Sequence, residues 1–304
     1  MDTQTSTTVS ALLDLSDDGV HAALPELERD GGARTLPSLS AEDGSGALWL
    51  PGLECVSAQG PDTLWLHDAL LGPYSADIVG YLGLVRATGG PVLDLGSGAG
   101  RLAVPFARHG FAVVAVDRDG PSLLRLRQWA RRIGPRTDRL VTTVRADLTE
   151  LRLRGRYQLA VLAGAMITAV PPHARPALLR EIASHLGTGG LLALDFPDHA
   201  PARLAERPRR AFAFRVPRFD GVTETVVARQ VFDLADMSER ITYYCRCSTP
   251  RGVHLRTLTT HKWLVDPERL ARDIREAGMC VAQRCRHRID SVTEHVLLIC
   301  RPGA

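Results

Sequence analysis

Lysine is nearly absent from this chain: Lys262 is the only one among 304 residues, so almost every base is an arginine. Such uniform use of arginine indicates a general replacement of lysine rather than one dedicated basic surface. The net charge is only +3 at pH 7. Residues 1–46 are acidic and residues 201–304 are basic, so the carboxyl-terminal part could attract an anionic substrate. We nevertheless do not expect nucleic acid as a partner, because the general replacement of lysine by arginine explains the basic residues without a dedicated binding surface.

Long apolar runs and paired cysteines are also lacking. No apolar run reaches the roughly 18 residues that a membrane-spanning helix needs, and the first ten residues lack the basic and apolar parts of a secretory signal. We therefore expect a cytoplasmic protein without a membrane partner. The six cysteines form no CxxC pair and no zinc-finger spacing, so no metal site is expected. Cys245 and Cys247 would share one face of a strand, which leaves a redox or metal pair open, but reduced, buried thiols are the simpler interpretation.

Short apolar strands alternate with amphipathic helices in the middle of the chain. The pattern predicts strands at 92–95, 112–116, 140–145, 159–163 and 191–196, with helices at 102–109, 122–133 and 174–186. Wholly apolar strands are typical of a parallel sheet that is covered on both faces. Two further strands near 281–286 and 295–300 bring the total to seven. The predicted fold class is therefore α/β, with a Rossmann-like, doubly wound, mostly parallel seven-stranded sheet.

The flanking regions have other periodicities. Residues 62–88 have helical spacing with a break at Gly72-Pro73, which predicts an N-terminal helical lid. Alternating strands are expected at 211–216, 223–232, 240–248 and 253–263, which predicts an antiparallel β insert. We therefore expect a flexible N-terminal segment at 1–46, a helical lid at 47–90, the Rossmann-like core at 91–196, the insert as an acceptor cap at 197–264, and the last helix and strands of the core sheet at 265–304.

A glycine-rich turn follows the first core strand, in the sequence Asp94-Leu95-Gly96-Ser97-Gly98-Ala99-Gly100. Glycines allow a sharp bend and let a ligand lie on the main chain, and ligands of open α/β sheets bind at such strand ends. The dinucleotide fingerprint G-x-G-x-x-G/A fails here because its last position is Arg101. The carboxylate of Asp94 would repel a pyrophosphate but attract a ligand that carries positive charge.

This stretch resembles motif I of class I S-adenosylmethionine-dependent methyltransferases. The resemblance is strong over residues 90–196 and weaker over the final helix and strands. It implies S-adenosylmethionine as the cofactor and an enzymatic methyl transfer. It also implies that Asp94 holds the amino group of the methionine part, that Asp117 accepts hydrogen bonds from both ribose hydroxyls, and that Asp147 lies near the adenine amino group. The implied cofactor-binding residues are Tyr74, Asp94, Gly96, Ser97, Gly98, Gly100, Asp117, Arg118, Ala146, Asp147, Leu148, Ala163 and Gly164.

The sequence differs from known methyltransferase motifs at two places, and the second difference bears on the class of acceptor. The turn from Leu186 to Gly190 resembles the family's L-x-P-G-G turn, with Thr188 in place of proline. Methyltransferases that act on nucleic-acid amino groups carry Asp/Asn-Pro-Pro-aromatic after the fourth strand. Here that position reads Ala163-Gly164-Ala165-Met166, which disfavours that class and fits a compact acceptor pocket.

The acceptor is expected to be a small molecule or a peptide, methylated at N or O in natural-product biosynthesis. Methyl transfer mainly requires alignment and exclusion of water, so a general base is needed only if the nucleophile must lose a proton. The candidates for catalytic roles are Tyr74, His199 and His261, with Asp195 or Asp198 as groups that could hold an amine. Tyr74 is expected to close over the cofactor from the lid.

Short segments before and inside the core, including Leu66-His67-Asp68-Ala69, are similar to methyltransferases that tailor ribosomally made peptides, especially the daptide type. That resemblance implies a terminal amine of a peptide as the acceptor. Two other readings stay open, namely an inactive methyltransferase-like subunit that only binds a ligand or partner, and a nicotinamide-dependent oxidoreductase. The sequence also leaves a homo-oligomer open.

Overall fold

The computed structural model describes residues 53–55, 76–206, 208–217, 223–249, 252–289 and 293–303. The chain divides into two compact units. One contains residues 59–204 and 262–304, and the other contains residues 1–58 and 205–261. The predicted segment 1–46, the first piece of the predicted lid helix, and the candidate Tyr74 lie outside the described residues.

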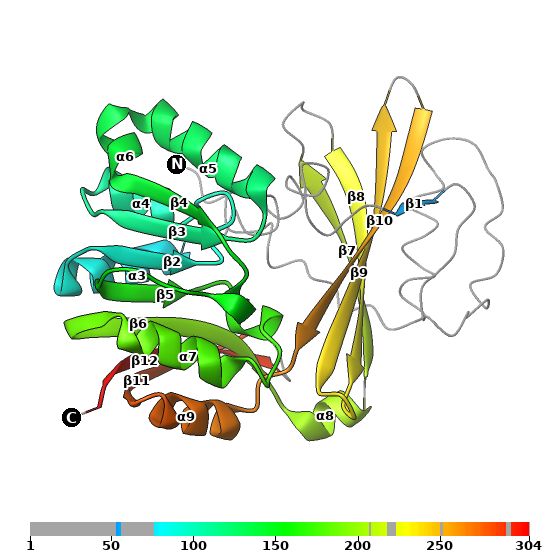
Figure 1. The fold of residues 1–304 in the computed structure, drawn as a ribbon. Coiled ribbons are helices and arrows are strands. Elements are labelled where there is room, and N and C mark those ends of the chain that lie inside the picture. The colour runs from blue at the N-terminus through cyan, green and yellow to red at the C-terminus, as the bar shows by residue number, and fades with distance from the viewer. Residues whose placement is uncertain are drawn as a thin grey trace, which may run out of the picture. The chain divides into compact units, whose positions relative to one another are not determined.

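The larger unit is built on a seven-stranded sheet with the strand order β11-β12-β6-β5-β2-β3-β4 (Figure 1). Strands β6, β5, β2, β3 and β4 run parallel to one another, while β12 pairs antiparallel with both β6 and β11. The strands are β2 Val92–Leu95, β3 Val113–Asp117, β4 Val141–Arg145, β5 Tyr157–Leu162, β6 Leu186–His199, β11 Met279–Arg288 and β12 Thr293–Pro302. The predicted fold class is confirmed.

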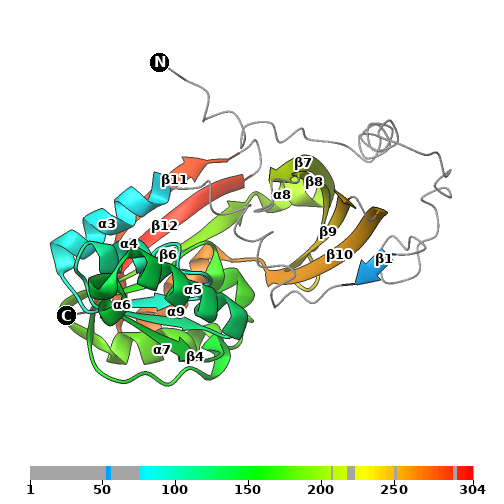
Figure 2. The same cartoon turned by 90° about the horizontal axis from the view of Figure 1, so that it is seen from above.

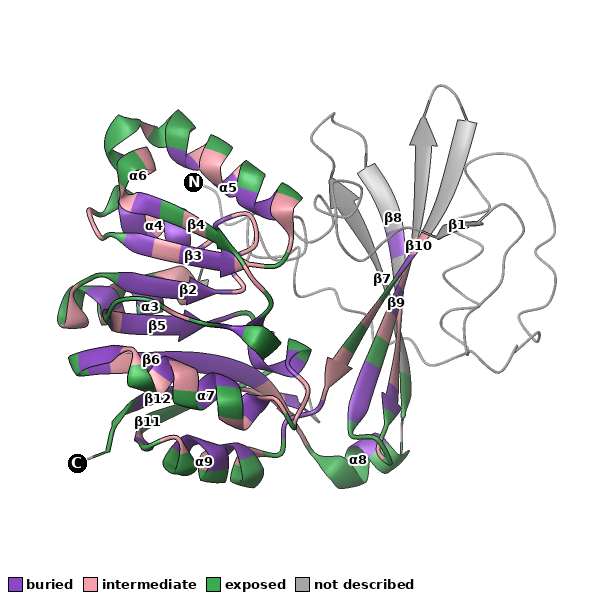
Figure 3. Ribbon diagram, viewed as in Figure 1, coloured by how far each residue is buried: buried purple, intermediate pink, exposed green. Residues whose placement is uncertain are grey.

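Helices cover both faces of this sheet, as the two perpendicular views in Figures 1 and 2 show. Side chains of α3, α4 and α5 form one apolar cluster with β2, β3 and β5. Side chains of α7 and α9 form the other cluster with the opposite face. Both faces of the central strands are therefore buried (Figure 3), which explains their wholly apolar sequences. The helices are α3 Ala76–Thr88, α4 Ala103–Arg108, α5 Gly120–Ile133, α6 Pro135–Leu140, α7 Arg175–Ser184 and α9 Pro267–Glu276.

The smaller unit contains a five-stranded sheet with the order β1-β10-β9-β8-β7. The β7–β8 and β8–β9 pairs are antiparallel, as the sequence predicts. Strand β1 pairs in parallel with β10, although it falls in the range 47–90 that the sequence suggests is helical. The strands are β1 Leu53–Cys55, β7 Arg209–Pro217, β8 Thr223–Asp233, β9 Ser238–Thr249 and β10 Gly252–Trp263, and the short helix α8 spans Pro201–Glu206.

Helix ends follow the capping chemistry of the sequence. The side chain of Asp119 accepts the N–H of Ser122 at the start of α5, and that of Asp266 accepts the N–H groups of Glu268 and Arg269 at the start of α9. Such caps satisfy main-chain donors that have no partner within the helix. Helix α6 is not predicted from the sequence, because its six residues are mostly polar, follow Gly134 and resemble a loop.

Strand β6 begins earlier than expected, at Leu186 rather than at residue 191. Tyr157 of β5 pairs with Leu186, but Leu159 pairs with Leu191, so the glycine-rich stretch 187–190 bulges out of the strand. The sequence predicts a turn at 187–190 before the strand, whereas the structure includes this stretch in β6. Steric crowding explains the glycine at 190, because a Cβ there would lie 2.9 Å from the carbonyl oxygen of Tyr157.

Among the described helices, none has the length and apolar character needed to cross a bilayer.

Candidate functional site

The chain departs in opposite directions from the neighbouring strands β2 and β5, which makes their carboxyl ends the switch point of the sheet. Open α/β sheets bind ligands at this place. The glycine turn follows β2, and Ala163 and Gly164 follow β5. The structure therefore brings two of the predicted cofactor-binding segments to one edge.

The glycine turn is fixed to the end of β3 by main-chain hydrogen bonds. The N–H groups of Gly96 and Ser97 both donate to the carbonyl oxygen of Val116, at 2.8 and 3.0 Å. The turn needs left-handed backbone at Gly98, whose φ is 52°. A Cβ at Gly98 would meet nothing within 4 Å. The main chain at Gly98 therefore faces open space where a ligand could lie directly on it.

The other two glycines of the turn face protein. A Cβ at Gly96 would lie 2.6 Å from the side chain of Met166, and a Cβ at Gly100 would lie 2.6 Å from Leu126 Cγ. Both positions combine positive φ with a crowded side, so larger residues are excluded. Gly100 therefore acts through packing beneath the turn.

Asp94 is the most unusual group at this edge. It lies within β2, is only 3% exposed, and its Oδ2 has no hydrogen-bond partner among the described residues. Burial raises the pKa of Asp94 to about 7, against the lowering effect of the nearby Arg101 guanidinium. The hydroxyl of Ser97 is buried and equally without a partner in the described part of the chain. Buried polar atoms normally have partners, so both groups are suited to a ligand that donates hydrogen bonds.

Asp117 ends β3 beside the same turn. Its Oδ2 accepts the N–H of Gly98 and its Oδ1 accepts the N–H of Asp119, both at 2.8 Å. A carboxylate has about four lone-pair sites, so each oxygen can accept one more donor. This arrangement is compatible with a ribose diol at Asp117.

The predicted adenine-side residues lie next to Asp117. The N–H of Ala146 donates to the main-chain oxygen of Asp117 at 3.0 Å, and the Asp147 carboxylate lies 3.9 Å from the Arg118 guanidinium. Asp147 accepts the N–H and hydroxyl of Thr149, and the first of these bonds is the main cause of its lowered pKa. Leu148 is buried. The structure thus gathers Asp117, Arg118 and residues 146–148 at the ends of β3 and β4.

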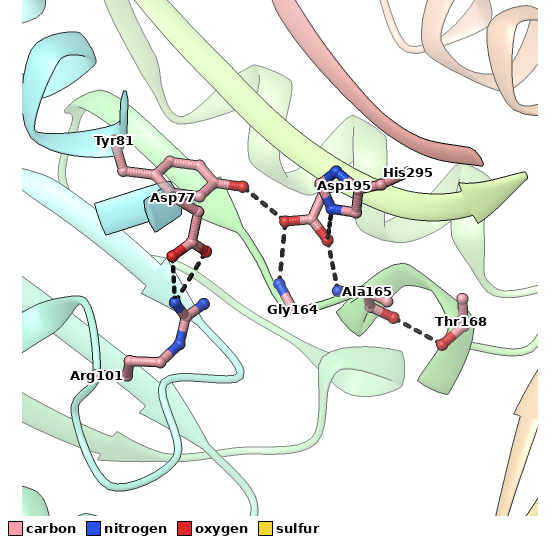
Figure 4. Close-up of polar contacts among 8 residues, drawn as sticks. All are labelled: Asp77, Tyr81, Arg101, Gly164, Ala165, Thr168, Asp195 and His295. Carbon is pink, nitrogen blue, oxygen red and sulfur yellow. Dashed lines mark hydrogen bonds and ion pairs between the residues drawn. The ribbon is translucent and has the colours of Figure 1, made fainter. Parts of the chain in front are cut away.

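One ion pair and one group of hydrogen bonds at this edge could not be predicted from the sequence. Arg101 Nη1 contacts both carboxylate oxygens of Asp77 in the first turn of α3, at 2.6 and 2.8 Å (Figure 4). Asp195 on β6 accepts hydrogen bonds from the turn after β5 and from Tyr81. Asp195 is therefore engaged within the protein, which corrects its expected role in holding an amine. The separations along the chain are 24 and 114 residues, so no local pattern reveals them.

The candidates for catalytic roles come from other parts of the chain than the glycine turn. His199 ends β6, and its Nδ1 lies 3.1 Å from the Thr293 hydroxyl. His261 is exposed on β10 and belongs to the smaller unit. Asp198 forms an ion pair with Arg286 at 4.0 Å, and burial raises its pKa. Among the described residues, no cluster of His, Cys, Asp and Glu is arranged to hold a metal ion.

Residues 92–190 match the protein family described as "Methyltransferase domain". Among curated proteins, the chain is 33% identical over 165 residues to the cypemycin N-terminal methyltransferase of a Streptomyces species; the match covers 54% of this chain and 64% of that protein. The chain thus spans less than two thirds of the length of this relative.

Solved structures share the fold. The CcbJ methyltransferase from Streptomyces caelestis aligns with a TM-score of 0.60 at 22% identity, over 75% of this chain and 90% of that one. An S-adenosylmethionine-dependent methyltransferase from Clostridium acetobutylicum aligns with a TM-score of 0.63 at 12% identity, over 79% of this chain and 97% of that one. The fold of this chain is therefore similar to that of these two proteins.

Proposed function

We propose that the protein transfers a methyl group from S-adenosylmethionine to an amine of a small molecule or peptide. The match of residues 92–190 to the family described as a methyltransferase domain supports this proposal. The cofactor would supply a methyl group that is activated by a sulfonium centre. The residues of the chain bind and orient the two reactants and exclude water.

The unpartnered, buried carboxylate oxygen of Asp94 carries this proposal. S-adenosylmethionine bears an ammonium and a sulfonium, and a cation beside Asp94 would stabilise the ionised carboxylate that burial penalises. A pyrophosphate at the same place would be repelled. The open side of Gly98, adjacent to Asp117, gives the ribose room to lie on the main chain.

The remaining cofactor contacts are assigned from the edge of the sheet. Asp117 receives the ribose hydroxyls, and Ser97 donates or accepts through its buried hydroxyl. Arg118, Ala146, Asp147 and Leu148 line the adenine side. Ala163 and Gly164 face the methionine part, Gly96 and Gly100 act through the shape of the turn, and Tyr74 closes over the cofactor from the segment before α3.

The acceptor amine must reach the methyl carbon as a free base, so a nearby group has to accept its proton. His199 is our first choice, because it ends β6 at the carboxyl edge of the sheet and its ring is oriented by Thr293. His261 and Tyr74 remain candidates for positioning the acceptor. The insert at 197–264 is proposed to act as the acceptor cap. The similar protein from Streptomyces is named as an N-terminal methyltransferase, which favours a terminal peptide amine among the possible acceptors.

Calorimetric titration of the purified chain tests the cofactor. S-adenosylmethionine and S-adenosylhomocysteine should bind, NAD should not, and Asp94→Asn should bind the first two at least ten-fold more weakly, as for a lost charge-assisted contact. Asp138→Asn is the matched control, because this aspartate lies in α6 and is not among the proposed cofactor contacts. Binding of NAD alone would refute the proposal in favour of an oxidoreductase.

Mass spectrometry tests the acceptor. Peptides with a free terminal amine should gain one or more methyl groups, with equal release of S-adenosylhomocysteine, while the same peptides with an acetylated terminus should not. A chain that binds the cofactor but modifies no amine, hydroxyl or peptide in a broad panel would instead be an inactive binding subunit.

A further inference from the structure

The carboxylate of Asp195 holds the turn after β5 by its main chain. Its Oδ2 accepts the N–H of Gly164 at 3.0 Å and its Oδ1 accepts the N–H of Ala165 at 2.6 Å. Asp195 is 2% exposed and lies in the middle of β6. Two successive main-chain donors are thus bound by one buried side chain from the neighbouring strand (Figure 4).

The turn has a conformation that needs such support. Ala165 has a φ of 59°, in the left-handed region that residues with a Cβ rarely adopt. Its carbonyl oxygen accepts both the N–H and the hydroxyl of Thr168, at 2.9 and 2.6 Å. Strained backbone persists only where several contacts define it together, and such places cluster at functional sites.

Tyr81 connects this turn to α3. Its hydroxyl donates to Asp195 Oδ2 at 2.7 Å, and its ring is 3% exposed in the apolar cluster beneath α3. Burial and the Asp195 charge raise the pKa of Tyr81, so the hydroxyl stays protonated and remains a donor. Asp77 lies four residues earlier, on the same side of the helix, and binds Arg101, the residue that follows the glycine turn. One face of α3 therefore contacts both turns of the candidate site.

Charge at Asp195 is stabilised in spite of its burial. Burial by itself would raise the pKa of Asp195, but the contacts with His295, Tyr81 and Ala165 outweigh it, so the pKa lies below its ordinary value. His295 on β12 lies 3.6 Å from Asp195 Oδ1, and this contact raises the pKa of the imidazole. The carboxylate is therefore ionised: it accepts hydrogen bonds from Tyr81, Gly164 and Ala165, and it forms an ion pair with His295.

We propose that Tyr81 and Asp195 are positioning residues for the cofactor: they hold the Gly164–Ala165 main chain in its binding shape and make that shape depend on the seating of α3. This inference rests on the proposed function, because the turn after β5 would border the methionine part. Neither side chain needs to touch the ligand. Loss of the Tyr81 hydroxyl leaves the apolar packing of the ring intact but removes one of the contacts that orient Asp195.

The test compares two matched deletions of a buried hydroxyl. Tyr81→Phe removes the donor to Asp195. Tyr157→Phe removes a hydroxyl that donates to the Arg154 carbonyl at 2.8 Å, at the opposite end of β5. Binding of S-adenosylhomocysteine to the full chain is measured by calorimetry, and thermal unfolding is measured without ligand.

We expect both variants to lower the unfolding temperature by similar amounts, but only Tyr81→Phe to weaken binding, by about ten-fold. Asp195→Asn should weaken binding further, because an amide has only one oxygen and its NH2 group cannot accept the second main-chain N–H. Equal affinities of Tyr81→Phe and the unmodified chain, or equal losses in both Tyr→Phe variants, would overturn the inference. An unmodified chain that fails to bind S-adenosylhomocysteine would instead refute the proposed function.

Discussion

Both carboxylate oxygens of Asp77 lie within hydrogen-bonding distance of one guanidinium nitrogen of Arg101, at 2.6 and 2.8 Å. The two side chains are 13% and 20% exposed, so water screens the pair only partly. This contact joins the first turn of α3 to the residue that follows the glycine turn. It gives a role to the arginine that, in the sequence, only marked a departure from the dinucleotide fingerprint.

Asp77→Asn should lower the free energy of unfolding by about 1 kcal/mol, because a partly buried ion pair is lost. It should also weaken the binding of S-adenosylhomocysteine, since the glycine turn loses its contact with α3. Asp138→Asn removes a similarly exposed pair with Arg127, between α6 and α5, and serves as the control. Equal binding by both variants would show that the α3 contact has no bearing on the cofactor.

Cofactor binding should depend on pH through Asp94. The folded-state pKa of about 7 lies above the ordinary 3.8, so this group favours the folded chain at low pH and that contribution is lost as the pH rises through 7. A cationic ligand selects the ionised carboxylate, so affinity should rise roughly ten-fold between about pH 6 and about pH 8 while protons are released. Calorimetry in buffers of different ionisation enthalpy measures both effects.

Asp94→Asn supplies the control for this pH dependence. The variant should bind weakly with no rise in affinity across neutral pH. If it retained the same slope, another group would be responsible for the proton release.

Substitutions within the glycine turn should separate binding from stability. Gly98→Ala places a Cβ in open space, so the chain should lose only the roughly 1–2 kcal/mol of left-handed strain but bind the cofactor poorly. Gly100→Ala places a Cβ 2.6 Å from Leu126 Cγ and should lower the unfolding temperature much more. Chemical denaturation and calorimetry distinguish the two effects. Normal binding by Gly98→Ala would mean that the ligand does not lie on this turn.

Arg175 should matter for stability alone. It is 4% exposed and donates to the carbonyl oxygens of Val170, Trp263 and Leu264, which joins α7 to the segment before α9. Arg175→Met should cost about 2 kcal/mol, because these carbonyls lose their donors, with unchanged affinity for S-adenosylhomocysteine. Arg180→Met, at an exposed position of α7, should change neither quantity in the same denaturation and binding measurements.

The strands and helices with a regular hydrophobic pattern could be predicted from the sequence. Alternating apolar strands and helices give the order of the core elements, and the carboxylate before Gly96 indicates a cationic ligand. Helix α6 was missed because it is short and polar, and the start of β6 was misplaced because its glycine-rich bulge resembles a turn. Local sequence patterns therefore predict which segments of the chain end at the ligand-binding edge of the sheet.

Contacts that depend on tertiary structure could not be predicted. Asp195 looks like a free acid at the end of an apolar strand, but its hydrogen-bond donors come from the turn after β5 and from α3, and its ion-pair partner comes from β12. Only the folded sheet places β5 between β2 and β6, and therefore Gly164 beside Asp195. The hydrogen bond of the Tyr81 hydroxyl could likewise not be predicted, because its partner is 114 residues away in the sequence.

The hydrogen bonds from Gly98 and Asp119 to Asp117 also have a kinetic consequence. They orient the Asp117 carboxylate before any nucleoside arrives. A diol that meets such a preformed acceptor needs little rearrangement of the loop. Association would then be governed by diffusion and access, and differences in affinity among turn variants would arise mainly from how quickly the nucleoside leaves.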